Sequence, residues 1–440
     1  MKSYNIHDTI FAPITSLGSG SICVFRISGK EVDKFLDYLK IKDKISHSMI
    51  KLVKIIKNDV ILDSAMIAYF KQPSSFTGED CIEVSLHGSD YIISEFEDLL
   101  LHLEFRFAER GEFMYRAVMN NKISLTEAES IKALIDSKTE KQHNFAIRGM
   151  DGKIERIYKN WHEVLFNILS LIETEIDFSD QNLDLNHLQK KLRDQIGFIL
   201  EEMKKYLSQS RYSDKISDGI NIVVYGAPNV GKSSLLNAIA KKDIAITSSI
   251  AGTTRDIISF STELNGFLVH FFDTAGIREN ADNIIEQEGI RRAINKIKSA
   301  DIKIFVLDPL CKDEKYIQNI VAENDIIVMN KIDLNPEVDL RNMIGIIAKD
   351  GIGLDILMQK ITEIIKNKYE FFNDSMFVSR RQKTLVQESF EILNAIDLKN
   401  EIEIIAEEIR SVLLRLNKIF NPYSQEDILT NIFQNFCIGK

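Results

Sequence analysis

Apolar and polar positions follow three different patterns along the 440 residues of the chain. Up to about residue 118, short apolar runs of β type (ICVFRISG, SAMIAYF and CIEVSLHG) are mixed with one helical stretch near Tyr91–Leu103. Such runs predict strands, and a helix among them is typical of a small α+β domain. We predict this domain over residues 1–118.

Helical periodicity replaces this pattern from residue 119 onward, as in ISLTEAESIKALIDSKTEKQ and LDLNHLQKKLRDQIGFILEEMKKYLSQS. It returns near residue 376 and continues to the end, with a break at NPYSQED. Apolar residues at helical spacing form one face that must be buried. We therefore predict one discontinuous α-helical domain, formed by residues 119–214 and 376–440 packing together.

Residues 215–375, between the two helical parts, alternate apolar runs with helical segments. The runs are INIVVYG, FLVHFFD, DIKIFVLD, DIIVMNK and MIGIIAK. This rhythm is typical of a mostly parallel sheet covered by helices. The predicted fold class is an α+β N-terminal domain and a discontinuous α-helical domain with an inserted α/β domain.

The clearest chemical motif follows the first of these runs, where Gly226-Ala-Pro-Asn-Val-Gly231-Lys232-Ser233 matches GxxxxGK[ST]. Glycines allow backbone N–H groups to approach phosphate, and the helix N-terminus that follows favours an anion. Lys232 would reach the outer phosphates, and the Ser233 hydroxyl would bind Mg²⁺. The alternative is a Gly-rich turn between a strand and a helix.

Two further motifs follow later strands in the order of a P-loop GTPase. Asp273–Gly276 (DTAG) supplies a carboxylate that holds Mg²⁺ through water and a glycine that senses the γ-phosphate. Asn330–Asp333 (NKID) resembles the NKxD motif, in which the Asp accepts from guanine and excludes adenine. Ligands bind at the carboxyl ends of such strands, so the three motifs together predict a GTP site.

The loop Ile250–Asp256 (IAGTTRD) is expected to act as a switch, with Thr254 closing over Mg²⁺ once GTP is bound. An ordinary Gly/Thr loop is the alternative. Ile277 follows the DTAG motif. Switch GTPases such as Ras carry a glutamine here that orients the attacking water. Another group must orient the water in this chain, or hydrolysis is slow. The last guanine motif is also imperfect, since Ile347 replaces the serine of Ser-Ala-Lys.

Charge and cysteine usage restrict the partners. The net charge of −10 disfavours a broad nucleic-acid face, so any RNA contact must use a local basic patch or be shared with a partner. The four cysteines (Cys23, Cys81, Cys311 and Cys437) form no CxxC pair, which disfavours a zinc site and fits a reducing cytoplasm. We find no export signal and no apolar run that could span a bilayer, and expect a cytoplasmic protein without a membrane partner.

Further segments fall in a characteristic order: DTIFAPIT, VFRISG, PSSFTGED, GEFMYRAVMNNKISLTEAE, IDF, IAGTTRD, DTAGIR and the terminal FCIGK. In this order they resemble the tRNA-modifying GTPase family called MnmE or TrmE. The resemblance spans essentially the whole chain. The GEF…RA…NNK run and FCIGK are much more specific than the GTP motifs, which many GTPases share.

The resemblance implies an N-terminal domain that binds tetrahydrofolate and forms a homodimer. With the flavoprotein MnmG (GidA), in a heterotetramer or larger assembly, the family adds a carboxymethylaminomethyl or aminomethyl group to carbon 5 of the wobble uridine in tRNA. The implied cofactors are GTP, Mg²⁺, K⁺ and 5-formyl- or 5,10-methylene-tetrahydrofolate, while FAD and NADH belong to the partner. Potassium between paired G domains takes the place of an arginine finger.

The resemblance also assigns roles to single residues by position. The implied potassium ligands are Asn229, Ser248, the backbone of Ile250, and Thr253. The implied folate contacts are Arg26, Glu83, Lys122 and Lys440. Glu286 is the implied water-orienting residue, preferred over Glu288 although the switch has one extra residue before it. Cys437 either takes part in the chemistry or is a buried structural thiol.

The predicted site is therefore large. The predicted catalytic residues are Glu286, Lys232 and Cys437, and the predicted Mg²⁺ ligands are Ser233 and Thr254. The predicted GTP contacts are Asn229, Val230, Gly231, Lys232, Ser233, Ser234, Ser248, Thr253, Thr254, Asp273, Thr274, Ala275, Gly276, Asn330, Lys331, Asp333, Ala348 and Lys349.

Two other functions remain as alternatives. A non-catalytic regulatory GTPase switch of the ribosome-assembly type would need a basic RNA-binding module, which this acidic chain does not show. A folate-binding interaction module would carry a degenerate G domain. Four key residues of this G domain are intact: Lys232, Ser233, Asp273 and Asp333.

Overall fold

The structure is a computed structural model. It describes residues 7–15, 20–41, 49–177, 185–242, 258–273, 295–309, 325–335, 337, 340, 342–369, 378–420 and 433, without the side chains of 185–188, 211, 258 and 259. The chain forms two compact units. The first contains residues 1–132, 152–203 and 384–440, and the second contains residues 133–151 and 204–383. Three of the four unit boundaries fall within helices α4, α7 and α12, and the fourth lies between α5 and α6; the bounds of these helices are given below.

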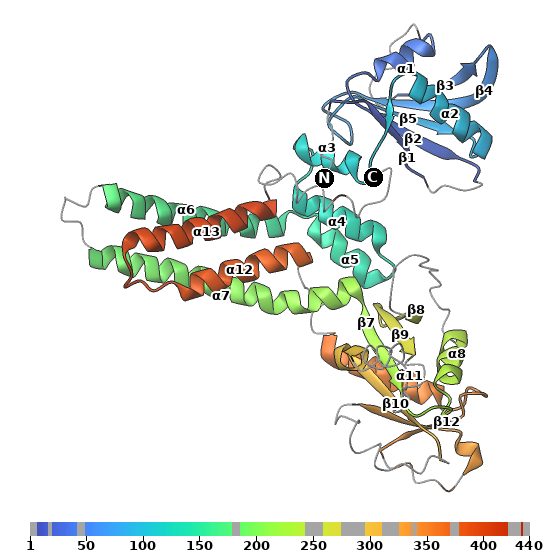
Figure 1. The fold of residues 1–440 in the computed structure, drawn as a ribbon, viewed down its shortest axis with the longest axis vertical. Helices are drawn as coiled ribbons and strands as arrows, with labels where there is room; N and C mark the ends of the chain where they lie inside the picture. The colour runs from blue at the N-terminus through green and yellow to red at the C-terminus, as the bar shows by residue number, and fades with distance from the viewer. Residues whose placement is uncertain are drawn as a thin grey trace, which may run out of the picture. The chain divides into compact units, whose positions relative to one another are not determined.

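The first unit contains a six-stranded sheet in the order β3-β4-β5-β2-β1-β6 (Figure 1). Its strands are β1 Ile10–Pro13, β2 Cys23–Ser28, β3 Ile50–Lys57, β4 Val60–Phe70, β5 Cys81–Leu86 and β6 Arg106–Phe107. Neighbouring strands are antiparallel except β1 with β6. One face is covered by α1 (Asp33–Tyr38) and α2 (Asp90–His102), whose Phe35 and Phe96 join the core with Phe25 of β2.

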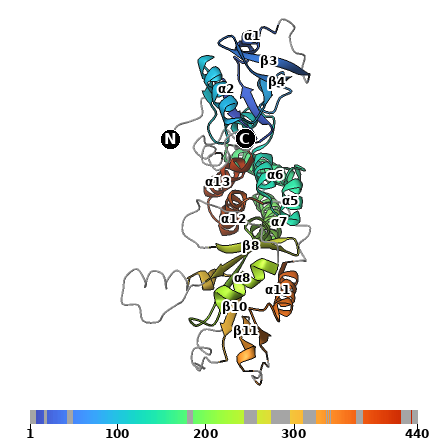
Figure 2. The same cartoon turned by 90° about the vertical axis from the view of Figure 1, so that its right-hand side faces the viewer.

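The helices of the first unit come from both ends of the chain. After α3 (Glu112–Met119) and α4 (Leu125–Asp136), the long helix α6 (Lys153–Asp177) lies beside α13 (Ile402–Phe420) (Figures 1 and 2). Both helices carry an apolar stripe at helical spacing that is buried. Their packing confirms the predicted discontinuous helical domain, which α7 (Leu185–Asp218) and α12 (Arg380–Ala395) complete.

The second unit contains a sheet in the order β12-β11-β10-β7-β9-β8. Its strands are β7 Ile220–Tyr225, β8 Ile258–Leu264, β9 Phe267–Asp273, β10 Ile302–Leu307, β11 Ile326–Asn330 and β12 Ile344–Ile346. Every pairing is parallel except β8 with β9, as the predicted mostly parallel sheet requires. Helix α8 (Lys232–Lys242) packs on β9, and α11 (Leu354–Tyr369) packs on β12; Figure 1 labels all four elements.

Helix α5 (Glu140–Gly149) lies against β9 in the second unit. The ammonium group of Lys141 is 4.0 Å from the centre of the Phe267 ring, and Gln142 Nε2 donates to Ser217 O at 3.0 Å. Residues 133–151 therefore belong to the unit of the parallel sheet, which the helical pattern alone did not reveal. Among the described helices, none has the length and apolar composition that crossing a membrane requires.

Candidate functional site

The phosphate-loop motif connects the carboxyl end of β7 to α8. Gly226 and Gly231 have φ angles of +149° and +97°. A β-carbon on Gly226 would lie 2.4 Å from Val306 O, and one on Gly231 would lie 2.2 Å from Asn330 Nδ2. Glycine is required at both positions because the ends of the neighbouring strands approach the loop backbone so closely.

Lys232 and Ser233 begin α8 at the edge of this loop. The buried Lys232 ammonium donates to Gly226 O at 3.1 Å and to Ala227 O at 2.9 Å, and burial lowers its pKa from the ordinary value. Ser233 Oγ donates to Asp273 Oδ2, at the end of β9, at 2.7 Å. A hydroxyl and a carboxylate oxygen are the donors that Mg²⁺ prefers, so these two residues fit the predicted ion.

Asn330 joins three of the predicted segments. Its buried side chain donates from Nδ2 to Val230 O at 2.8 Å, and its Oδ1 accepts from Ala348 N at 3.0 Å. The NKID motif, the phosphate loop and the imperfect guanine motif therefore meet at one amide group. Asp333 lies in a short 3₁₀ turn (Ile332–Leu334) and is exposed, as is Lys349.

Lys331 makes a second connection to the phosphate loop. Its Nζ donates to Asn229 O at 2.8 Å and pairs with Asp308 Oδ2 at 2.5 Å. Asp308 is not among the site residues predicted from the sequence. The available signal was its position as a charged residue that ends the apolar run DIKIFVLD, at the carboxyl end of a buried strand.

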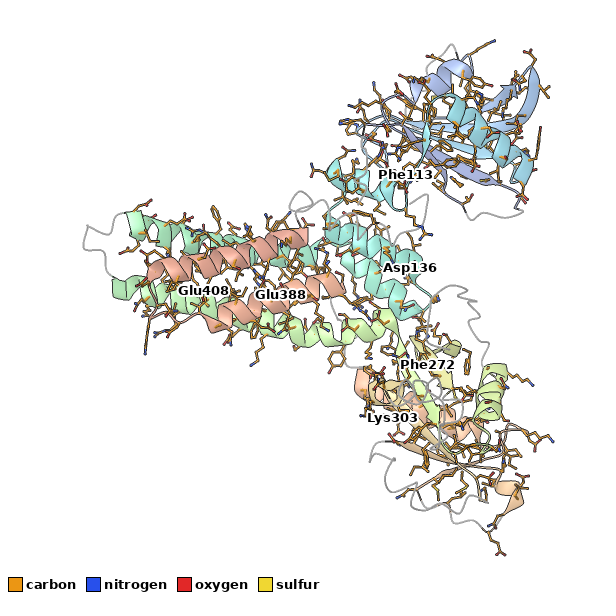
Figure 3. All side chains as sticks on the ribbon, viewed as in Figure 1. Phe113, Asp136, Phe272, Lys303, Glu388 and Glu408 are labelled. Carbon is orange, nitrogen blue, oxygen red and sulfur yellow. The ribbon has the colours of Figure 1, made fainter. Side chains whose placement is uncertain are left out.

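The two described folate candidates on the sheet of the first unit face each other. Arg26 of β2 and Glu83 of β5 are paired in register, and Arg26 Nη2 lies 2.8 Å from Glu83 Oε1. The Arg26 guanidinium is 4.4 Å from the centre of the Phe76 ring and 5.6 Å from that of Phe113, which Figure 3 labels on α3. The guanidinium of this pair therefore lies near two aromatic rings.

Lys122 follows α3 and is the third described folate candidate. It lies against the segment 76–78, which also contains Phe76. A β-carbon on Gly78 would lie 2.8 Å from Lys122 Cγ, and Asn120 Nδ2 donates to Thr77 O at 2.8 Å. The segment 76–78 thus contacts Arg26 through Phe76 and lies against Lys122 through Gly78.

A buried charge network explains the GEF…RA motif. Glu112 and Arg116, one turn apart on α3, are both fully buried and lie 3.0 Å apart. Glu112 also pairs with Arg106 at 2.7 Å, and Arg116 pairs with Glu79 at 3.0 Å. Because buried charges require partners, this network ties α3 to the loop after β4 and to β6.

Two family models match the chain: "GTP-binding protein TrmE N-terminus" over residues 9–122 and "MnmE helical domain" over residues 125–437. The chain belongs to the MnmE family. It is accordingly a tRNA modification GTPase and a GTP hydrolase, which confirms the resemblance, the fold class and the enzyme class predicted from the sequence.

Curated MnmE relatives match along their whole length. The tRNA modification GTPases MnmE of Rickettsia rickettsii (strain Sheila Smith) and Rickettsia akari (strain Hartford) are each 38% identical, with 98% of this chain and 100% of theirs covered. Among solved structures, Era in complex with MgGDPNP and a segment of 16S ribosomal RNA is 28% identical. That match covers 33% of this chain and 56% of that chain, with a TM-score of 0.26.

Several predicted site residues of this MnmE chain lie outside the described residues. They are Ser248, Ile250, Thr253, Thr254, Thr274, Ala275, Gly276, Glu286, Cys437 and Lys440. Their roles stay predictions. The described residue nearest the terminal motif is Phe433, whose ring lies 5.8 Å from that of Tyr115 on α3.

Proposed function

We propose that the chain hydrolyses GTP as one component of a complex that modifies the wobble uridine of tRNA, and that K⁺ activates hydrolysis when two G domains pair. The supporting observation is a GTP site whose parts meet at Asn330, combined with Ile277 in the place of the water-orienting glutamine. Such a site has the residues that bind nucleotide, but it lacks the glutamine that orients the attacking water. Hydrolysis therefore needs a further catalytic group.

The predicted site residues have the following roles in this proposal. The Lys232 ammonium neutralises the outer phosphates, and Ser233 and Asp273 hold Mg²⁺. When bound, Mg²⁺ and K⁺ supply positive charge where negative charge develops on the transferred phosphoryl group. Asp333 accepts hydrogen bonds from guanine, Glu286 orients the attacking water and Thr254 closes over the magnesium site.

The donor set fits potassium. Asn229 contributes an amide oxygen, Ser248 and Thr253 contribute hydroxyls, and Ile250 contributes a backbone carbonyl. Neutral oxygens of this kind replace the hydration shell of K⁺ in proteins. Asn229 is exposed and has a left-handed backbone with φ of +64°, so the described ligand is accessible at the loop surface.

The N-terminal domain is proposed to bind a 5-formyl- or 5,10-methylene-tetrahydrofolate, which supplies the one-carbon unit. Arg26 and Glu83 offer donors and acceptors beside the Phe76 ring, a combination that suits a flat heterocycle with polar edges. Lys122 near this domain and Lys440 at the C-terminus are the other proposed folate contacts, and Cys437 is proposed to take part in the chemistry.

The proposed assembly is a homodimer that joins MnmG in a heterotetramer or larger complex in the cytoplasm. MnmG brings FAD and NADH, and the product is a carboxymethylaminomethyl or aminomethyl group on carbon 5 of the uridine. Within the chain, we propose domain limits at 1–118, 119–214, 215–375 and 376–440.

The deciding experiment is steady-state hydrolysis of GTP by the full chain in KCl and in NaCl at equal ionic strength, with ATP as the control nucleotide. We expect strong stimulation by K⁺ and no turnover of ATP. Asn229→Ala should lose the stimulation by K⁺. The control is Asn237→Ala, which changes an exposed asparagine on α8 and should keep the stimulation. Equal slow rates in both salts would instead indicate a switch that needs an outside activator.

A second experiment separates the modification enzyme from a pure switch. Removal of the terminal CIGK should abolish the modified tRNA in the presence of MnmG and leave the GTP hydrolysis rate unchanged. Retention of the tRNA product by the shortened chain would contradict a role for Cys437 and Lys440.

A further inference from the structure

The ends of three neighbouring parallel strands meet at one ammonium group. Strand β10 lies between β7 and β11 in the sheet. Asp308 follows β10, Asn229 lies in the loop after β7, and Lys331 follows β11. Lys331 Nζ lies 2.5 Å from Asp308 Oδ2 and 2.8 Å from Asn229 O, so one side chain joins all three strand ends.

We infer that Asp308 is a positioning residue of the GTP site, which holds Lys331 on the phosphate loop. The side chain of Asp308 is 10% exposed and that of Lys331 is 36% exposed, so the carboxylate anchors a cation that would otherwise extend into water. Partial burial limits screening of the pair, and hydrogen bonds between charged groups are the strong ones. Lys331 in turn donates to the Asn229 carbonyl and fixes the loop.

The backbone at both ends of this contact is strained. Asn229 and Lys331 have φ angles of +64° and +58°, in the left-handed region that residues other than glycine seldom adopt. Such conformations persist only where surrounding contacts hold them. The contacts of Lys331 with Asp308 and with the Asn229 carbonyl reach both strained positions. The hydrogen bonds of Asn330 do not replace these contacts, because they go to Val230 and Ala348.

Two consequences follow for the nucleotide. Without the Asp308 carboxylate, the phosphate loop and the guanine motif lose one of their links, so nucleotide should dissociate faster. Asn229 should also lose its fixed position, which would weaken potassium activation. The second consequence rests on the potassium dependence proposed above, and the first does not.

The test compares two aspartates at opposite ends of β10. Asp301 precedes the strand and pairs with Lys215 at 2.7 Å, and its side chain is also 10% exposed. It is seven positions from Asp308 in the sequence, or about 23 Å along a strand. Asp308→Asn and Asp301→Asn therefore each remove one largely buried charge next to the same strand, but only the first does so at the nucleotide end.

The primary measurement is the rate at which fluorescent methylanthraniloyl-GDP dissociates from the full chain with Mg²⁺ in NaCl, followed by stopped flow. We expect dissociation about tenfold faster in Asp308→Asn, from the loss of one charged hydrogen bond, and an unchanged rate in Asp301→Asn. Both variants should unfold at lower temperature than the parent chain. If Asp308→Asn does not fold, Asp308→Ser removes the same charge and leaves a smaller side chain.

A double-mutant cycle then separates positioning from general weakening of the fold. In a Lys331→Met background, Asp308→Asn should cause no further acceleration, because its effect passes through Lys331. Additive acceleration, or an unchanged rate in Asp308→Asn alone, would overturn the inference.

Potassium titration of GTP hydrolysis provides the second readout. We expect the half-saturating K⁺ concentration to rise in Asp308→Asn and not in Asp301→Asn. If the parent chain shows no potassium stimulation, the proposed activation fails, but the dissociation rates still decide the role of Asp308.

Discussion

Replacing Arg116 by methionine should destabilise the first unit strongly. Arg116 is fully buried on α3, and its guanidinium lies 3.0 Å from both Glu79 and Glu112. Methionine fills part of the volume but removes the charge. The substitution therefore leaves two carboxylates without their shared cation, and Glu112 is itself completely buried.

The expected loss is about 3 kcal/mol of unfolding free energy. Removing one partner from a buried ion pair costs roughly 3–5 kcal/mol, because the remaining charge is left in a poor solvent. We expect the lower end of this range because Glu112 keeps Arg106 at 2.7 Å and Glu79 keeps the Ser28 hydroxyl at 2.7 Å. For a unit of this size, the loss corresponds to a Tm lowered by roughly 6–12 °C.

Thermal unfolding of the full chain, followed by circular dichroism, measures this loss. We expect a transition for each of the two compact units, and added GDP should raise that of the second unit and so identify that of the first. The matched control is Arg410→Met, which removes exposed ion pairs with Glu173 and Glu407 in the same unit and should leave the transition nearly unchanged, because water screens exposed pairs. Equal Tm shifts for the two variants would refute the reasoning from burial.

Two further predictions concern the second unit. Gly231→Ala should weaken GDP binding by at least about tenfold in a fluorescence titration, because the new β-carbon would lie 2.2 Å from Asn330 Nδ2 at a φ of +97°. Gly197→Ala on α7, where a β-carbon meets nothing within 4 Å, should leave binding unchanged. Burial lowers the pKa of His270 below its usual 6.5. The folded state therefore favours the neutral imidazole, and the stability that depends on it is fully present above about pH 6.5. That stability is lost as pH falls through the folded pKa, because the buried ring must then take up a proton. The Tm of this unit should therefore fall between about pH 7 and pH 5, and His270→Gln should reduce that slope; an undiminished slope would exclude His270 as its source.

Local signals in the sequence were sufficient for most secondary structure and for the location of the nucleotide motifs. The runs INIVVYG, FLVHFFD and DIKIFVLD became β7, β9 and β10, because continuous apolar stretches of this length suit strands buried on both faces. The phosphate loop was recognisable because its chemistry needs particular residues at fixed spacing within eight positions. Helical periodicity likewise predicted the apolar faces of α6 and α13, which lie far apart in sequence.

Only the tertiary structure decided which distant residues share an environment. Asp308 and Lys331 are 23 positions apart and Glu79 and Arg116 are 37 apart, so no local pattern links either pair. The same holds for α5, whose amphipathic pattern required a buried face but did not specify β9 as its partner. Periodicity and turn chemistry act within a few residues and determine elements, whereas a charged pair or a packed face depends on strand order, which long-range contacts establish on folding.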